Sequence, residues 1–161
     1  MTGGRPGVLV VGGGLVGRSI AYALCRRDFD VRVVDAAAAP SQASRGSLGV
    51  LTHFNGGDSP LSRLYRDSHA SFAGLAAELG AATGIDIGWR QPGGMDLLFD
   101  DEDAAAAQET LRLNRERGCQ VEELDAAAVL RLEPAVAPSV RGALFFPQDH
   151  RVDPEALSEA L

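Results

Sequence analysis

The stretch that decides the fold is VLVVGGGLVG, residues 8–17. Residues 8–11 form an apolar run bounded by glycine, which predicts a short strand buried on both faces. Apolar residues then recur at helical spacing from Leu15 to about Arg27, and residues 31–34 form a second strand-like run that ends at Asp35. A strand, a glycine turn, a helix and a strand within about 30 residues predict a βαβ unit.

The six residues from Gly12 to Gly17 match the pattern G-x-G-x-x-G, in which each glycine meets a different demand. Gly12 permits the sharp turn out of the strand. Gly14 lets the backbone approach a diphosphate, and Gly17 lets the helix pack closely on the strand. The start of the helix offers N–H groups and a partial positive charge to the phosphates. The pattern therefore predicts a dinucleotide-binding turn.

Asp35 lies 18 residues after Gly17, where a carboxylate can accept hydrogen bonds from ribose hydroxyls. The same carboxylate would repel a 2′-phosphate, which argues against NADP. FAD and NAD both remain open on these residues alone. The chain continues with a loop of small residues over 41–49 instead of another strand and helix, and this favours FAD over a nicotinamide dehydrogenase.

The rest of the chain predicts helices and strands without a regular strand-helix alternation. Pro60 begins a long helix that Gly80 can end. Residues 85–89 and 95–99 alternate apolar and polar side chains, as the two strands of a hairpin do. The other predicted elements are helices over 102–117, from Asp125 to Pro134 and from Asp153 onward, and strands over 121–124 and 140–146.

The composition limits the kinds of partner. Of the 161 residues, 15 are Lys or Arg and 22 are Asp or Glu, and the net charge of −7 argues against nucleic acid as a partner. No apolar run reaches the roughly 18 residues of a transmembrane helix, and no signal peptide is evident. The two cysteines and three histidines have no metal-ligand spacing. We expect a cytoplasmic protein with no metal site.

Five stretches, in this order, carry a resemblance to a known family. They are GGGLVGRSIAYAL (12–24), ASRGSLGVL (43–51), TGIDIGWRQPGGMDLLF (83–99), LRLEPAVAPSVRGALFFP (130–147) and RVDPEAL (151–157). With them the chain resembles the N-terminal portion of the FAD-dependent amine and amino-acid oxidoreductases of the D-amino-acid oxidase superfamily. It is most similar there to the glycine oxidases of thiamine biosynthesis.

The resemblance implies an α/β fold with a doubly wound, Rossmann-like FAD-binding core and an inserted substrate domain, an α+β domain on a mixed sheet. The first part of the core would cover residues 1–52, the beginning of the substrate domain 53–148, and the return to the core 149–161. The last predicted helix has no stop signal before Leu161, so we expect a chain truncated at its C-terminus.

The resemblance also implies a set of FAD contacts. The diphosphate would lie on Leu15 and Val16 beside the three motif glycines, and the adenosine ribose on Asp35 with Ala36 next to it. The flavin side of the cofactor would be lined by Ala43, Ser44, Leu48, Gly49 and Val50. The family usually has glutamate at the position of Asp35, and small residues where Arg45 stands.

The implied activity is oxidation of the C–N bond of a small amino acid or secondary amine, by oxidative deamination. The substrate-binding arginine of the family lies outside this portion, so no catalytic residue is assigned and we expect the fragment to be inactive alone. The full-length protein could form a homo-oligomer. The alternatives are a FAD amino-acid dehydrogenase that uses a quinone acceptor, an NAD-dependent dehydrogenase, and a remnant that keeps the nucleotide fold without activity.

Overall fold

A computed structural model describes residues 5–36, 46–52, 59–116 and 118–161. The chain forms two compact units. The first comprises residues 1–50, 72–89 and 152–161, and the second comprises residues 51–71 and 90–151. No helix in the described part of the chain is long and apolar enough to cross a membrane.

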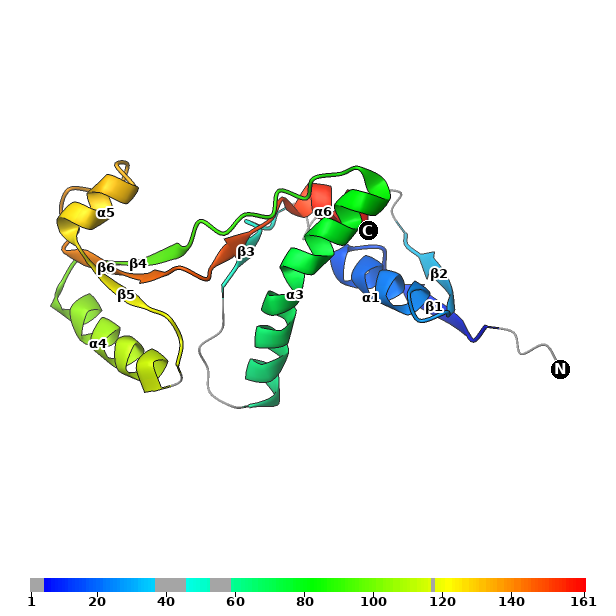
Figure 1. Cartoon of the computed structure of the whole chain (residues 1–161), viewed down its shortest axis with the longest axis horizontal. Coiled ribbons are helices and arrows are strands. Elements are labelled where there is room, and N and C mark those ends of the chain that lie inside the picture. Colours follow the sequence, from blue (N-terminus) through cyan, green and yellow to red (C-terminus); the bar gives the residue numbers. More distant parts are fainter. Residues whose placement is uncertain (1–4, 37–45, 53–58, 117) are drawn as a thin grey trace. The chain divides into compact units, whose positions relative to one another are not determined.

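The first unit contains the predicted βαβ arrangement. Strand β1 (Gly7–Val11) pairs in parallel with β2 (Asp30–Val34), and helix α1 (Leu15–Cys25) connects them (Figure 1). Burial on both faces was expected for β1, and this expectation is wrong. Val10 faces α1, whereas the side chains that alternate to the other face are exposed, with Leu9 at 61% and Val11 at 81%.

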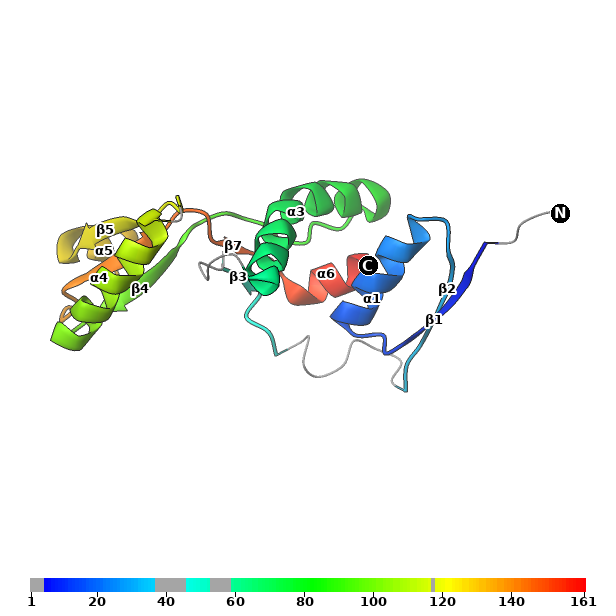
Figure 2. The ribbon, with the colours of Figure 1, turned by 90° about the horizontal axis from the view of Figure 1, so that it is seen from below.

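Helix α6 (Pro154–Ala160) packs against α1 in the same unit (Figure 2). Its start confirms the predicted cap, because the Asp153 carboxylate accepts hydrogen bonds from the N–H groups of Glu155 and Ala156. The second half of helix α3 (Pro60–Thr83) also belongs to this unit, where Leu79 is fully buried. Capping defines the start of α6, and packing places it beside α1.

Helix α3 begins at Pro60 as predicted but does not end at Gly80. It continues to Thr83, and Gly84, with a φ of 77°, follows the helix and donates its N–H to the Gly80 carbonyl over 2.9 Å. Gly84 therefore takes the left-handed position that commonly ends a helix. Gly80 remains a residue of the helix.

The predicted hairpin between residues 85–89 and 95–99 is also wrong. Residues 84–89 form no strand, and strand β4 (Gly94–Leu98) pairs with residues far along the chain. The Ile87 carbonyl accepts a hydrogen bond from the Asp153 N–H, and Gly88 has a φ of 65°. This segment therefore bonds to the residues before α6, and its backbone cannot stay extended.

The second unit is built on a three-stranded antiparallel sheet in the order β4-β6-β5. Strands β5 (Glu122–Asp125) and β6 (Gly142–Phe146) and helices α4 (Asp101–Glu116) and α5 (Ala126–Leu132) confirm the predicted elements in this region. Asp125 caps α5 by accepting the Ala128 N–H. Only antiparallel pairs occur among the described strands of this sheet, so the expected mixed sheet stays a prediction.

Two clusters of buried side chains cover the faces of this sheet. Ala107 and Leu111 of α4 pack with Leu144 and Phe146 of β6. Val129 of α5 packs with Val140 and Ala143. Because β6 contributes to both clusters, it is the most buried strand of the unit. Two short strands, β3 (Val50–Leu51) and β7 (His150–Arg151), form a separate ladder.

Candidate dinucleotide-binding site

The glycine turn joins β1 to α1. At two of its positions the structure requires glycine. Gly12 has a φ of 108°, a conformation that L side chains rarely adopt, and its N–H donates to the Val34 carbonyl over 2.8 Å. A Cβ at Gly17 would overlap the carbonyl oxygen of Gly12. Gly12 thus makes the turn, and Gly17 allows α1 to pack against it.

Gly14 differs from these two glycines because its backbone does not require glycine. It is the N-cap of α1, with a φ of −72° and a ψ of 179°, values that any residue adopts. As a glycine it has no side chain with which to cap the helix, and the first turn of α1 holds no acidic residue. The first turn therefore places no negative charge of its own at the head of α1, and the start of a helix favours an anion.

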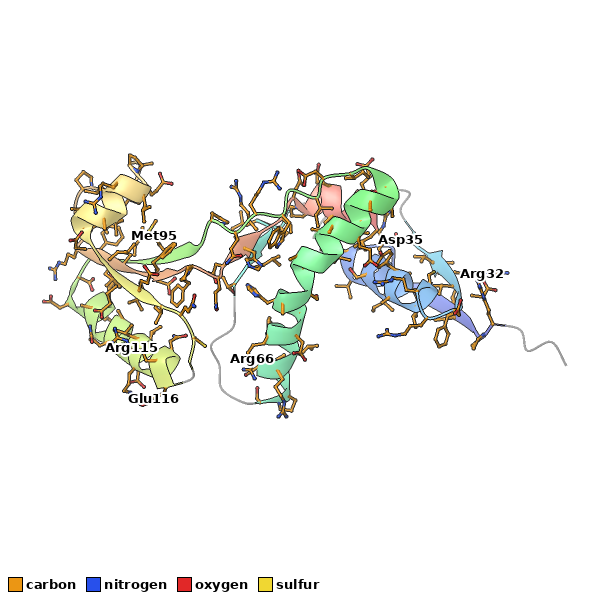
Figure 3. The ribbon with its side chains drawn as sticks, in the orientation of Figure 1. Arg32, Asp35, Arg66, Met95, Arg115 and Glu116 are labelled. Carbon is orange, nitrogen blue, oxygen red and sulfur yellow. The ribbon has the colours of Figure 1, made fainter. Side chains whose placement is uncertain are left out.

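Asp35 lies at the carboxyl end of β2 with its side chain beside the turn (Figure 3). Its Oδ2 accepts the Gly13 N–H over 2.5 Å, and the side chain is exposed. An added Cβ on Gly13 would lie only 3.3 Å from the Asp35 Cβ, so the two segments approach closely. The structure brings this acidic residue and the glycine turn together, as the sequence predicted.

Arg18 is a residue of this site that the sequence reasoning missed. Its Nε donates to the Gly13 carbonyl over 2.8 Å, and its Nη1 donates to the Ser158 carbonyl of α6 over 2.6 Å. The side chain is partly buried. The motif gave no signal for this role, because the second partner lies 140 residues away.

The other predicted cofactor contacts differ in their surroundings. Leu15 is half-buried in the first turn of α1, whereas Val16 is 74% exposed. Ala36 is exposed beside Asp35. Ala43 and Ser44 lie outside the described residues. All of these contacts stay predictions.

The segment Leu48–Val50 was predicted to line the flavin. Leu48 is 89% exposed and Val50 is 57% exposed, so both apolar side chains are accessible. Gly49 is buried with a φ of 68°, and a Cβ there would overlap the carbonyl oxygen of Val152. Glycine at this position is therefore required by the chain's own packing, and its contact with the flavin stays a prediction.

A cluster of titratable groups lies in the second unit. The rings of His69 and His150 stack with centroids 4.1 Å apart. Burial, and then repulsion by His69, lower the pKa of His150, while Asp149 acts in the opposite direction. Burial, and then Asp149, raise the pKa of Asp96. Among the described residues no group of three or more His, Cys, Asp or Glu side chains is placed to hold a metal ion.

The sequence of the chain matches one protein family and is similar to known glycine oxidases. Residues 7–161 match the family "FAD dependent oxidoreductase" (DAO). A glycine oxidase of Geobacillus kaustophilus is 33% identical over 161 residues, which cover 98% of this chain and 42% of that protein. A glycine oxidase of Bacillus licheniformis is 30% identical over 158 residues, covering 97% of this chain and 42% of that protein.

The solved structures that the chain resembles also include glycine oxidases. A crystal structure of glycine oxidase from Bacillus cereus ATCC 14579 superposes with a TM-score of 0.88 at 29% identity, covering 97% of this chain and 42% of the other. The chain therefore spans about 42% of the length of the relatives it matches.

Proposed function

Because the chain belongs to the DAO family of FAD-dependent oxidoreductases, we propose that it binds FAD on the turn between β1 and α1. In this proposal Gly12, Gly14 and Gly17, with Leu15 and Val16, form the diphosphate site. Asp35 binds the adenosine ribose. The family match supports FAD over the alternative of NAD.

The observation that carries the proposal is the backbone of Gly14 at the head of α1. Its dihedral angles are ones that any residue adopts, and as a glycine it contributes no capping side chain. A ligand that approaches the backbone would account for glycine at this position. The Asp35 carboxylate accepts the Gly13 N–H, but a carboxylate has about four acceptor positions. Ribose hydroxyls can donate hydrogen bonds to such a carboxylate.

The flavin side of the site is proposed to include Ala36, Leu48, Gly49 and Val50, together with Ala43 and Ser44. Exposed apolar side chains at Leu48 and Val50 suit contact with a flat ring system. When bound, FAD would supply the hydride acceptor for oxidation of the C–N bond of a small amino acid or secondary amine. The residues of this chain would hold and orient the cofactor, and no catalytic residue is assigned among them.

The substrate and the domain organisation belong to the same proposal. Similarity to a glycine oxidase supports an amino-acid substrate for the whole enzyme. We propose that residues 53–148 begin a substrate domain inserted into the FAD-binding core. Oxygen and a quinone are both possible electron acceptors. Steady-state rates with oxygen and with artificial acceptors distinguish the two.

The direct test is the visible absorption spectrum of the purified protein, together with titration of the apoprotein with FAD. We expect flavin absorption and FAD binding in the wild type. Gly14→Val should lower the affinity for FAD by more than about 100-fold, because a branched side chain would occupy the place of the diphosphate. The dihedral angles of Gly14 are ones that valine adopts, and circular dichroism checks that the variant is folded.

Gly7→Val is the matched control. It makes the same substitution in the same βαβ unit, and a Cβ at Gly7 meets no atom within 4 Å. FAD affinity should stay within about twofold of wild type. A wild-type protein that binds NAD and no flavin would disprove the proposal, as would unchanged FAD binding in Gly14→Val.

A further inference from the structure

We infer that Arg18 is a positioning residue for the bound diphosphate, acting through the peptide group between Gly13 and Gly14. This inference rests on the proposed FAD site. Arg18 joins two parts of the first unit that are distant in sequence, the glycine turn and the last turn of α6. Both of its acceptors are main-chain carbonyl oxygens, so its effect is on the backbone.

Arg18 fixes the direction of the Gly14 N–H. The Gly13 carbonyl and the Gly14 N–H belong to one planar peptide group, and in a trans peptide they point in opposite directions. Arg18 Nε holds the carbonyl at 2.8 Å. The Gly14 N–H must therefore point away from the guanidinium group. It is held in one direction at the head of α1.

Gly13 is held from its other side as well. Its N–H donates to Asp35, so both peptide groups that flank its Cα are fixed. Three consecutive glycines have more conformational freedom than any other tripeptide, and ordering them on ligand binding would reduce affinity. Arg18 and Asp35 together order the turn before the ligand arrives.

The second bond of Arg18 provides the anchor. Its Nη1 donates to the Ser158 carbonyl over 2.6 Å, which ties the guanidinium group to α6. A planar guanidinium group can donate to two carbonyls at once in a fixed geometry, whereas a lysine ammonium group is a flexible point charge. The two hydrogen bonds from Arg18 to the Gly13 and Ser158 carbonyls form the Arg18 clamp. This clamp requires arginine and not only a positive charge.

The test uses purified protein with three ligands: FAD, ADP and adenosine. Arg18→Met should weaken FAD and ADP binding about tenfold, as expected for loss of a charged hydrogen bond that orders the site. Adenosine has no phosphate and should bind within about twofold of wild type. Arg18→Lys retains the charge, and it should lose most of the same affinity. This ligand pattern separates a positioning role from general destabilisation, which would affect adenosine equally.

Arg27→Met is the matched control, because it makes the same substitution at an exposed arginine just after α1, at the opposite end of that helix from the glycine turn. This variant should bind all three ligands like wild type. Full ADP affinity in Arg18→Met, or full rescue by Arg18→Lys, would overturn the inference. If Arg18→Met does not fold, Arg18→Lys takes its place. Weaker ADP binding with unchanged adenosine binding would support the inference, and wild-type ADP affinity would overturn it. A wild-type protein that binds neither FAD nor ADP would instead disprove the proposed function.

Discussion

The two compact units differ in what holds their strands in place. In the second unit β6 is buried and contributes to both side-chain clusters, so packing on the two sides specifies its position. In the first unit, β1 and β2 carry large exposed side chains, with Val11 at 81% and Val34 at 46%. Their arrangement there depends on the parallel ladder, on backbone hydrogen bonds at the glycine turn, and on α1, which packs on one side of the two strands.

This difference predicts which property each kind of substitution should change, stability or ligand affinity. Loss of buried volume removes transfer free energy and leaves a cavity, so it should lower the stability of the second unit. Substitutions at the turn change backbone geometry that binds the proposed ligand, so they should affect ligand affinity as well as stability. Measuring both properties for each variant tests the comparison.

The largest effect on stability is expected for Leu111→Ala. Leu111 is 2% exposed and packs with Ala107, Leu144 and Phe146. Its truncation should lower the free energy of unfolding by about 2–5 kcal/mol, measured by denaturant titration. FAD affinity of the folded variant should remain unchanged. Leu132→Ala removes the same atoms at a side chain that is 59% exposed, and should stay within about 0.5 kcal/mol. Equal losses in the two variants would contradict the packing argument.

Gly17→Ala should produce the next largest loss of stability. The added methyl group would overlap the Gly12 carbonyl oxygen, so α1 must move away from the turn. We expect a loss of about 1–3 kcal/mol, accompanied by weaker FAD binding. Unlike Leu111→Ala, this variant should change both measured properties.

Gly74→Ala is the control for this prediction, because Gly74 also lies in a helix of the first unit. A Cβ there meets no atom within 4 Å. Removing a helical glycine should raise stability by about 0.5–1 kcal/mol with no change in FAD affinity. A gain in stability from Gly17→Ala would show that the close approach at the turn is not required.

The sequence predicted the features that depend on local demands. The turn at Gly12, the cap at Asp153 and the start of α3 at Pro60 each follow from a residue whose backbone or side chain restricts its neighbours. The carboxylate at Asp35 could be placed because a parallel βαβ unit brings the ends of its two strands together.

Features that depend on distant partners could not be predicted in this way. Residues 85–89 alternate as a strand does, but alternation does not identify the partner, and the segment bonds near Asp153 instead. Gly80 and Gly84 are both possible helix ends, and sequence spacing does not distinguish them. The Arg18 clamp on Ser158 joins residues 140 positions apart, so no local pattern indicates it.

The smallest predicted effect concerns pH and lies in the second unit. His150 is 8% exposed and stacks on His69, and both features lower its pKa from the ordinary value of 6.5. As the pH falls through 6.5, this histidine therefore binds a proton in the unfolded chain before it does so in the folded protein. The free energy of unfolding should decrease over that range, and the decrease should stop below the folded pKa. One pKa unit corresponds to about 1.4 kcal/mol.

His150→Phe isolates this contribution, because phenylalanine keeps an aromatic ring against His69 and does not titrate. The free energy of unfolding is measured for both proteins from about pH 8 to pH 5. As the pH falls, the wild type should lose stability relative to the variant. Ionisable groups that do not interact with His150 contribute equally in both proteins, so their contributions cancel in the difference. Parallel stability curves would show that burial of His150 does not disfavour its charged form.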